Sequence, residues 1–247
     1  MLVDLVDNLV DLVWPRHCLG CGAGGSAMCS ECSPVRTAVR FVPGLGPVHA
    51  AASYGGAVRS AIIHYKDRRR RDLRAPLAVL LSAAVGAARA DLAPNAAAAP
   101  DAGGLEPMAL GPPVLVPVPS TTRAARERGG DHMRRLAASV ARRQRLHADA
   151  LLRIGRPVKD AAGLGAAARA ANVAGAYVCR RAPPVGVGPR TRGGPVILVD
   201  DVITTGASLR EAARCLRAAG YHVQGCAVIA LVPAGRHIVG NRREGTR

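Results

Sequence analysis

The chain of 247 residues is long enough for one α/β domain of ordinary size and a small additional segment. Its formal net charge is +17, and with one Phe, one Trp and four Tyr its core must be built from aliphatic side chains. No stretch approaches the roughly 18 uninterrupted apolar residues of a transmembrane helix, so we expect no membrane span. The basic excess favours a phosphate-rich partner, although a composition rich in Arg, Ala, Gly and Pro accounts for its bulk equally well.

The N-terminal segment Met1–Trp14 is predicted to form an amphipathic helix that docks on its own protein. Its leucines recur at helical spacing, with Asp4, Asp7 and Asp11 between them. The segment lacks the basic start and the small-residue cleavage site of a signal peptide. We therefore expect a cytoplasmic protein whose thiols stay reduced.

Two Cys-x-x-Cys pairs follow closely, Cys18 with Cys21 and Cys29 with Cys32. Four thiolates at this spacing are typical of a tetrahedral zinc site, which would be structural because no coordination position stays open. A disulfide pair, a redox dithiol and an iron–sulfur cluster are the alternatives. A segment this small has little core of its own and would take its stability from the metal. Residues 1–35 thus form the first predicted unit.

The remaining chain alternates short apolar runs with helical patterns. Strands are predicted at 48–54, 114–118, 151–154, 176–179, 196–199 and 223–232. Helices are predicted at 59–89, with an interruption near Pro76, at 123–146, and at 208–219, where Gly220 ends the helix. This order predicts an α/β fold with a mostly parallel sheet flanked by helices. The domain spans residues 48–234, with a flexible insert at 93–113, and 235–247 form a basic tail.

Residues 196–208, Val-Ile-Leu-Val-Asp-Asp-Val-Ile-Thr-Thr-Gly-Ala-Ser, carry the strongest functional signal. Asp200 and Asp201 come at the carboxyl end of an aliphatic strand, where open α/β sheets bind ligands. The small and hydroxyl residues after them open a helix, whose N-terminus favours an anion. These residues are Thr204, Thr205, Gly206, Ala207 and Ser208.

This arrangement suits a ribose phosphate. The turn can take the 5′-phosphate, and the two carboxylates can accept hydrogen bonds from the ribose hydroxyls, directly or through Mg²⁺. The segment is neither a P-loop nor a Gly-x-Gly-x-x-Gly turn. It resembles the phosphoribosyl-pyrophosphate signature of type I phosphoribosyltransferases at every defining position. We expect the ligand to be phosphoribosyl pyrophosphate (PRPP) or another ribose phosphate.

The order of the segments is similar to that of the ComF family, whose members are described as competence or GntX-like proteins. The shared features are the N-terminal apolar helix with four cysteines, a basic helix around His64–Leu73, the run Val116–Pro119 before Arg126–Gly129, and the segment from Leu164 to Ala176 before the acidic loop. The resemblance implies a zinc ribbon fused to a phosphoribosyltransferase-like domain. It also implies a role in DNA uptake, with single-stranded DNA and the uptake machinery as partners, or in nucleotide metabolism.

The resemblance also implies roles for individual residues. The turn at Pro119–Arg123, which includes Ser120, matches the place where related enzymes hold pyrophosphate, and Arg126 and Arg128 match an Arg-x-Arg-Gly element. Arg169 and Asn172 match a flexible hood, and Arg169 is expected to close over the site beside Asp200 and Asp201.

The sequence departs from the family pattern at two places. Gly130, Asp131 and His132 stand where the family usually has a bulky residue followed by Asn-Gln, and Ala161 stands where it usually has Gln. Asp131 can keep the acceptor function of Asn but loses its donors. His132 is a candidate for a role at the site. The cysteines Cys179, Cys215 and Cys226 are expected to be small buried hydrophobic residues.

Three functions are compatible with these features. The first is a phosphoribosyltransferase that transfers the sugar from PRPP to a nitrogen acceptor. The second is an accessory protein that binds nucleic acid through its basic runs at 59–74 and 123–145, without the aromatic platforms that usually stack on single strands. The third is a regulator that binds a ribose phosphate without reaction.

Overall fold

The computed structural model describes residues 17–68, 70–92, 111–120, 131–158, 165–180 and 195–233. The predicted helix Met1–Trp14, most of the insert 93–113 and the tail 235–247 lie outside these residues. The candidate residues Arg123, Arg126 and Arg128 and the departures Gly130 and Ala161 also lie outside them.

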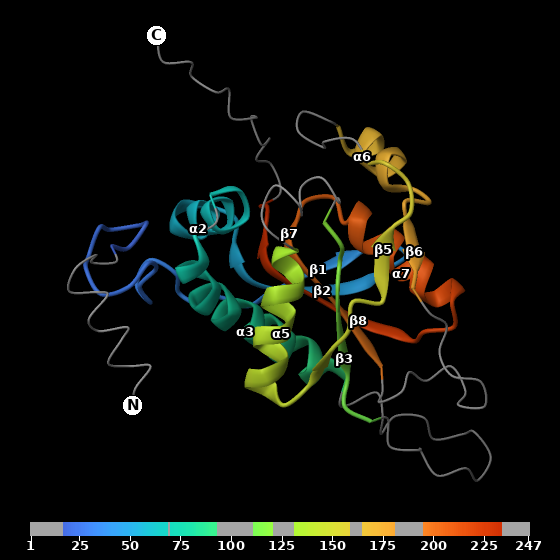
Figure 1. Cartoon of the computed structure of the whole chain (residues 1–247), viewed down its shortest axis with the longest axis horizontal. Helices are drawn as coiled ribbons and strands as arrows, with labels where there is room; N and C mark the ends of the chain where they lie inside the picture. Colours follow the sequence, from blue (N-terminus) through green and yellow to red (C-terminus); the bar gives the residue numbers. More distant parts are fainter. Residues whose placement is uncertain are drawn as a thin grey trace.

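A six-stranded sheet, with the order β1-β2-β8-β7-β3-β4, forms the centre of the molecule (Figure 1). Only the pairing of β1 with β2 is antiparallel, and the other neighbours in the sheet run parallel. This confirms the predicted α/β class. The strands are β1 (Ala38–Val42), β2 (Gly46–Ser53), β3 (Val114–Pro117), β4 (His147–Ala148), β7 (Val196–Ile203) and β8 (Val223–Leu231).

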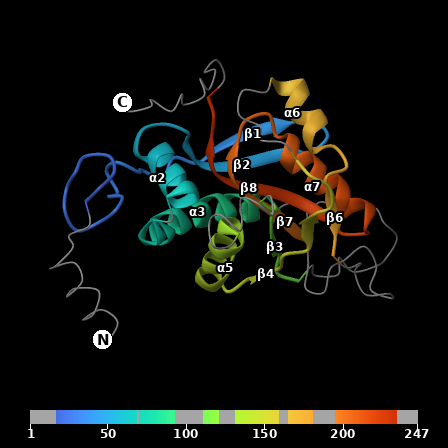
Figure 2. The same cartoon turned by 45° about the horizontal axis from the view of Figure 1, so that its top comes forward.

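Helices cover both faces of this sheet (Figure 2). On one face lie α2 (Gly56–Asp67), α3 (Arg74–Leu92) and α5 (His132–Gln144), and on the other lies α7 (Ala207–Ala218). A separate pair of strands, β5 (Leu152–Ile154) and β6 (Tyr177–Cys179), lies beside α7 with α6 (Ala166–Val173) between them in the chain.

The buried side chains of β7 alternate between two hydrophobic clusters. Ile197 and Val199 pack with α3 and α5, and Val196 and Leu198 pack with α7. This alternation follows from the period of two in a β-strand. Because both faces of β7 are covered, its sequence is a continuous aliphatic run, which is why this strand was predictable.

The helix prediction at 59–89 needs one correction. The break lies between α2 and α3, at residues 68–73, where a short 3₁₀ turn runs from Arg71 to Leu73. Pro76 lies inside the first turn of α3. A proline is tolerated there because the N–H groups of the first helical turn have no partner within the helix.

The sequence analysis missed β1 and β4. Strand β1 is an edge strand whose exposed Val39 and Phe41 give no sign of burial, and it depends on pairing with β2 across a turn at Gly44, where φ is 76°. Strand β4 contains only two residues.

One described segment, Arg71–Leu92, is long and apolar enough to cross a membrane by length and composition alone. Its larger side chains, Leu77, Leu80, Leu81 and Val85, are buried in the cluster that α3 shares with the sheet and α5. The helix therefore packs as the core helix of a globular domain packs.

Candidate functional site

The candidate site lies where the carboxyl ends of the parallel strands meet. Because β2, β8, β7 and β3 run parallel, the segments that follow them emerge at one edge of the sheet. Tyr54 follows β2, Ser120 follows β3, and Thr204 follows β7. Ligands bind at this edge in open α/β sheets.

Strand β7 is longer than predicted and includes the two acidic residues. It was expected to end at Val199, but it continues through Asp200 and Asp201 to Ile203, because β8 pairs with it as far as Ile203 opposite Leu231. On its other side the pairing with β3 ends at Pro117 opposite Val199. Residues 200–203 are therefore paired on one side only, among the described strands.

The two adjacent carboxylates face opposite sides of the sheet. Successive side chains of a strand alternate in direction, so Asp201 shares the face of Val199, and Asp200 shares the face of Leu198. The Asp201 backbone N–H donates to Asp200 Oδ1 at 2.8 Å. The prediction treated the acids as one pair, whereas the structure gives each carboxylate its own surroundings.

Asp201 is the centre of a polar network on the α2 and α5 side. Lys66 Nζ, near the end of α2, donates to Asp201 Oδ2 at 2.8 Å. His132 Nε2, at the start of α5, lies 3.1 Å from the same oxygen, and His132 Nδ1 lies 3.1 Å from Ser120 Oγ. The Asp201 side chain is 9% exposed and that of Lys66 is 35% exposed.

These neighbours keep Asp201 charged. Burial alone would raise the pKa of Asp201, but the Lys66 cation and the His132 hydrogen bond outweigh it and hold the pKa well below the usual value for Asp. The Asp201 carboxylate is therefore held in place, because moving it would leave a buried charge without its ion pair and hydrogen bond.

The pKa of Asp200 is shifted in the opposite direction. Burial, and then the neighbouring charge of Asp201, raise the pKa of Asp200 to about 8. Tyr177 of β6 and Cys226 of β8 lie on its side of the sheet, and the charge of Asp200 helps to raise the pKa of both. A cation or hydrogen-bond donor that a ligand brings close to Asp200 would therefore stabilise the ionised carboxylate.

The turn at residues 204–208 leads from β7 into the first turn of α7. Gly206, at φ 75° and ψ 8°, is the residue before α7, and the Ala207 N–H donates to Thr205 Oγ1 at 3.4 Å. The first N–H groups of a helix have no partner within it, and together with the helix dipole they attract negative charge. Ser208 lies close enough to Tyr177 to lower the pKa of its hydroxyl, although burial outweighs this and raises that pKa.

Arg40 of β1 binds the backbone at the start of this turn. Its guanidinium donates to the Thr204 carbonyl oxygen at 3.0 Å and also to the carbonyl oxygen of Val232, after β8. The Val232 N–H in turn donates to the carbonyl oxygen of Ile203 at 3.0 Å. A strand outside the parallel part of the sheet thus holds the end of β7.

The segment expected to form a hood is tied to α7 by a buried carboxylate. Glu211 Oε1 accepts the Gly175 N–H at 2.9 Å, and Arg214 binds both carboxylate oxygens of Glu211 at 2.7 and 2.8 Å. Arg169 and Asn172 lie on α6, just before this anchor. Their expected role in closing over Asp200 and Asp201 stays a prediction.

The structure explains one departure from the family pattern. Asp131 is the N-cap of α5, and its Oδ1 accepts the N–H groups of Met133 at 3.0 Å and Arg134 at 3.3 Å. An N-cap needs only an acceptor, so Asp serves there as well as Asn. Capping of α5 therefore does not need the amide donors that Asp131 lacks.

The four cysteines converge as the spacing predicted. Their sulfur atoms all lie within 4.8 Å of one another, and none of the four is in a disulfide. The backbone N–H groups of Gly20 and Cys29 each lie 3.4 Å from Cys18 Sγ, and such hydrogen bonds lower the pKa of Cys18 to about 6. Sulfur ligands at this spacing fit a zinc ion.

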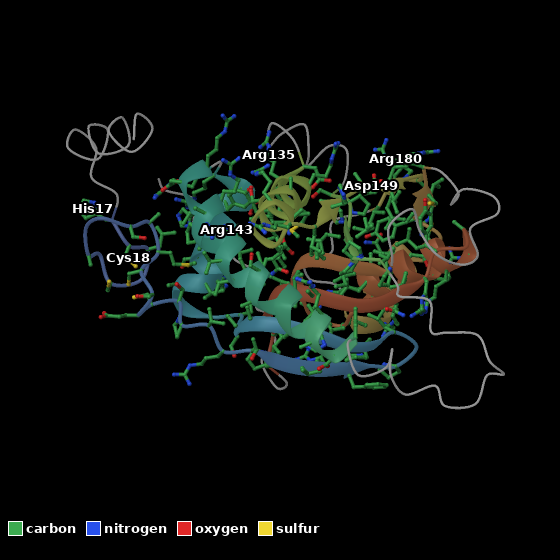
Figure 3. All side chains as sticks on the ribbon, turned by 90° about the horizontal axis from the view of Figure 1, so that it is seen from below. His17, Cys18, Arg135, Arg143, Asp149 and Arg180 are labelled. Carbon is green, nitrogen blue, oxygen red and sulfur yellow. The ribbon has the colours of Figure 1, made fainter. Side chains whose placement is uncertain are left out.

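The cluster has a fixed place on the molecule. Figure 3 shows Cys18 at one end, far from Arg180. A Cβ added at Gly20 would lie 2.9 Å from the Ala57 side chain at the start of α2, and Ala27 and Met28 are buried in the core cluster beside α2 and α3. The other expectation for cysteines also holds in large part, since Cys215 and Cys226 are buried and Cys179 is half-buried.

The sequence analysis missed three contributors to the site. Lys66 was expected only as part of the basic helix around His64–Leu73, Arg40 was not singled out, and Tyr177 was expected in a strand without a role. One signal was available for Lys66, because it is one of only two lysines among 34 basic residues. Nothing in the sequence indicated that Arg40 reaches Thr204.

The comparisons with known proteins bear on one part of the chain. The family model of the phosphoribosyl transferase domain matches residues 181–239. The described part of this match contains β7, with Asp200 and Asp201, and then the turn at 204–208, α7 and β8. The chain is therefore similar to phosphoribosyl transferase domains over this stretch, and its sheet and helices have the α/β arrangement predicted for them. A search of the curated proteins found no match.

Proposed function

We propose that the protein binds phosphoribosyl pyrophosphate, or another ribose 5-phosphate, at the carboxyl end of β7. The observation that carries this proposal is the turn from Thr204 to Ser208, which connects the end of β7, with Asp200 and Asp201, to α7 in a stretch similar to phosphoribosyl transferase domains. In this proposal the 5′-phosphate binds at the N-terminus of α7. Asp200 accepts hydrogen bonds from the ribose hydroxyls.

The proposal includes Mg²⁺ brought in with the pyrophosphate. Carboxylate and hydroxyl oxygens are the ligands that Mg²⁺ prefers, and Asp200 offers a carboxylate whose ionised form a cation would stabilise. The donor set therefore fits the ion. When bound, Mg²⁺ would neutralise charge on the departing pyrophosphate.

We further propose that the reaction, where one occurs, is transfer of the phosphoribosyl group to a nitrogen acceptor, with release of pyrophosphate. Such a reaction needs little covalent chemistry from the protein and depends on positioning and charge. Ser120, Arg123, Arg126 and Arg128 are assigned to the pyrophosphate. Arg169 and Asn172 are assigned to closure over the site. The resemblance to the ComF family supports a role in the cytoplasm, in DNA uptake or nucleotide metabolism.

Titration calorimetry with PRPP and Mg²⁺ tests the binding. We expect the wild type to bind and the double variant Asp200→Asn/Asp201→Asn to lose at least tenfold in affinity. The matched control is Asp91→Asn, which removes an exposed carboxylate that pairs with His49 near the C-terminal end of α3. No binding by the wild type would overturn the site, and pyrophosphate release on adding candidate nitrogen acceptors would establish turnover.

The second candidate function is binding of single-stranded DNA. It is supported by the exposed arginines Arg134, Arg142 and Arg143 on α5 (Figure 3 labels Arg143). The test is the salt dependence of binding to a labelled oligonucleotide. Backbone contacts predict a steep fall in affinity with salt, and loss of about one unit of the slope for each arginine replaced. A flat salt dependence would exclude binding of this kind.

A further inference from the structure

His132 connects two parts of the site that belong to different segments of the chain. Its Nδ1 lies 3.1 Å from Ser120 Oγ, after β3, and its Nε2 lies 3.1 Å from Asp201 Oδ2, in β7. Under the proposed function, Ser120 lies on the pyrophosphate side and Asp201 beside the ribose-binding strand. The imidazole touches both.

The arrangement of donors and acceptors is defined by Asp201. A carboxylate can only accept, and the Lys66 cation keeps the pKa of Asp201 low, so His132 Nε2 must carry the hydrogen that it shares with Asp201. The other ring nitrogen then faces the Ser120 hydroxyl, which can rotate to suit it. One ring therefore sets the direction of a carboxylate and of a hydroxyl at once.

The ring is held in place before any ligand arrives. His132 is the first residue of α5, directly after the N-cap Asp131, so its backbone position is fixed. The Tyr65 ring lies against it edge-on, with 6.3 Å between centroids and an interplanar angle of 75°. His132 itself is 6% exposed. Contacts on both nitrogens and with the Tyr65 ring restrain the orientation of the side chain.

We infer that His132 is a positioning residue that couples the Ser120 turn to Asp201, so that the two sides of a PRPP ligand are recognised as a unit. This inference rests on the proposed function. It gives a specific role to His132, which the sequence named only as a candidate for the site and which stands where the related family usually has Gln. Gln has a similar reach and also offers one donor and one acceptor, which makes it the conservative replacement.

The inference predicts a graded series of affinities for PRPP with Mg²⁺, measured by calorimetry. His132→Ala should lose about 10- to 100-fold, the usual cost of removing a partner that orients a binding group. His132→Gln should stay within about threefold of the wild type. The matched control is His222→Gln, an exposed histidine before β8, which should bind as the wild type does.

A double-mutant cycle distinguishes a positioning role of His132 from a general contribution to the stability of the fold. If His132 acts through Ser120, then Ser120→Ala should cost much less in the His132→Ala background than in the wild type. Pyrophosphate alone should show the same coupling, and ribose 5-phosphate should not show it, because it carries no group for the Ser120 side. A His132→Ala protein that melts far below the wild type would be replaced in this cycle by His132→Asn, which is too short to reach both partners.

Outcomes for the inference and for the proposed function are distinct. No binding of PRPP by the wild type removes the proposed function, and the inference with it. Wild-type binding together with undiminished binding by His132→Ala overturns the inference alone. Full additivity of Ser120→Ala and His132→Ala also overturns it, as does a His132→Gln variant that folds normally but binds as weakly as the alanine variant.

Discussion

Lys66 and Asp201 are 135 residues apart in the chain, yet Lys66 Nζ lies 2.8 Å from Asp201 Oδ2. The pair joins the end of α2 to β7. The Asp201 carboxylate is more buried than the lysine, at 9% against 35% exposed. Removing Lys66 and removing Asp201 should therefore lower the free energy of unfolding by different amounts.

The first prediction concerns this inequality. Lys66→Met leaves a buried carboxylate with one remaining partner, His132, and should lower the free energy of unfolding by about 2–3 kcal/mol. Asp201→Asn leaves an amide oxygen for His132 and a lysine that can turn to water, and should cost about 1 kcal/mol or less. Urea denaturation of both variants measures the difference. An equal loss of stability in the two variants, or a greater loss for Asp201→Asn, would contradict the finding that Asp201 is the more buried partner.

The second prediction concerns pH. The pKa of Asp200 is raised to about 8 in the folded protein and is near 4 in the unfolded chain, so between these values the folded state binds more protons. The contribution of Asp200 to stability therefore falls as the pH rises from about 4 to 8. Asp200→Asn should be more stable than the wild type at pH 9, by about 1–3 kcal/mol, and nearly equal at pH 4.

Thermal melting at the two pH values, without added metal, tests this sign. Asp201 acts in the opposite direction, because its lowered pKa adds stability above pH 4 that is lost on acidification. The Asp200→Asn variant should therefore keep the acid destabilisation that Asp201 causes. Equal melting temperatures for variant and wild type at pH 9 would show that Asp200 ionises normally.

The third prediction concerns Gly206. Its φ of 75° lies in the left-handed region, and a Cβ there would lie 3.0 Å from Val42 Cγ1. Gly206→Ala should lower the free energy of unfolding by about 1–2 kcal/mol and displace the turn that precedes α7. PRPP affinity should fall with it.

Gly86 provides the matched control for Gly206. It lies inside α3, and an added Cβ would meet nothing within 4 Å. Gly86→Ala should therefore stabilise the protein by about 0.5–1 kcal/mol through helix propensity. Equal effects of the two substitutions on melting temperature would refute the strain assigned to Gly206.

The fourth prediction concerns the cysteine cluster. Protein purified with zinc should contain about one ion per chain, and Cys32→Ser should reduce this content and lower the melting temperature. Cys179→Ser, in β6 and outside the cluster, should keep the full zinc content. Metal analysis by mass spectrometry decides between these outcomes, and iron in place of zinc would support the cluster alternative.

The sequence predicted those parts of the site that are local in the chain. The strand before Asp200, the turn at 204–208 and the four cysteines each lie within a short stretch whose spacing carries the chemistry. The approach of Lys66 and His132 to Asp201 depends on which helices cover which face, which no local pattern encodes. The separation of Asp200 from Asp201 was missed for a related reason. Whether a strand ends at Val199 or at Ile203 is decided by its neighbour β8.

The network around Asp201 also limits how the protein can be divided. The stretch 181–239, which matches the phosphoribosyl transferase domain, contains Asp201 but none of Lys66, His132 and Ser120. A transplanted copy of that stretch would carry the acidic loop into a new host without the cation and the imidazole that neutralise and orient it. The loop is portable as a sequence, but its electrostatic balance is a property of the whole domain.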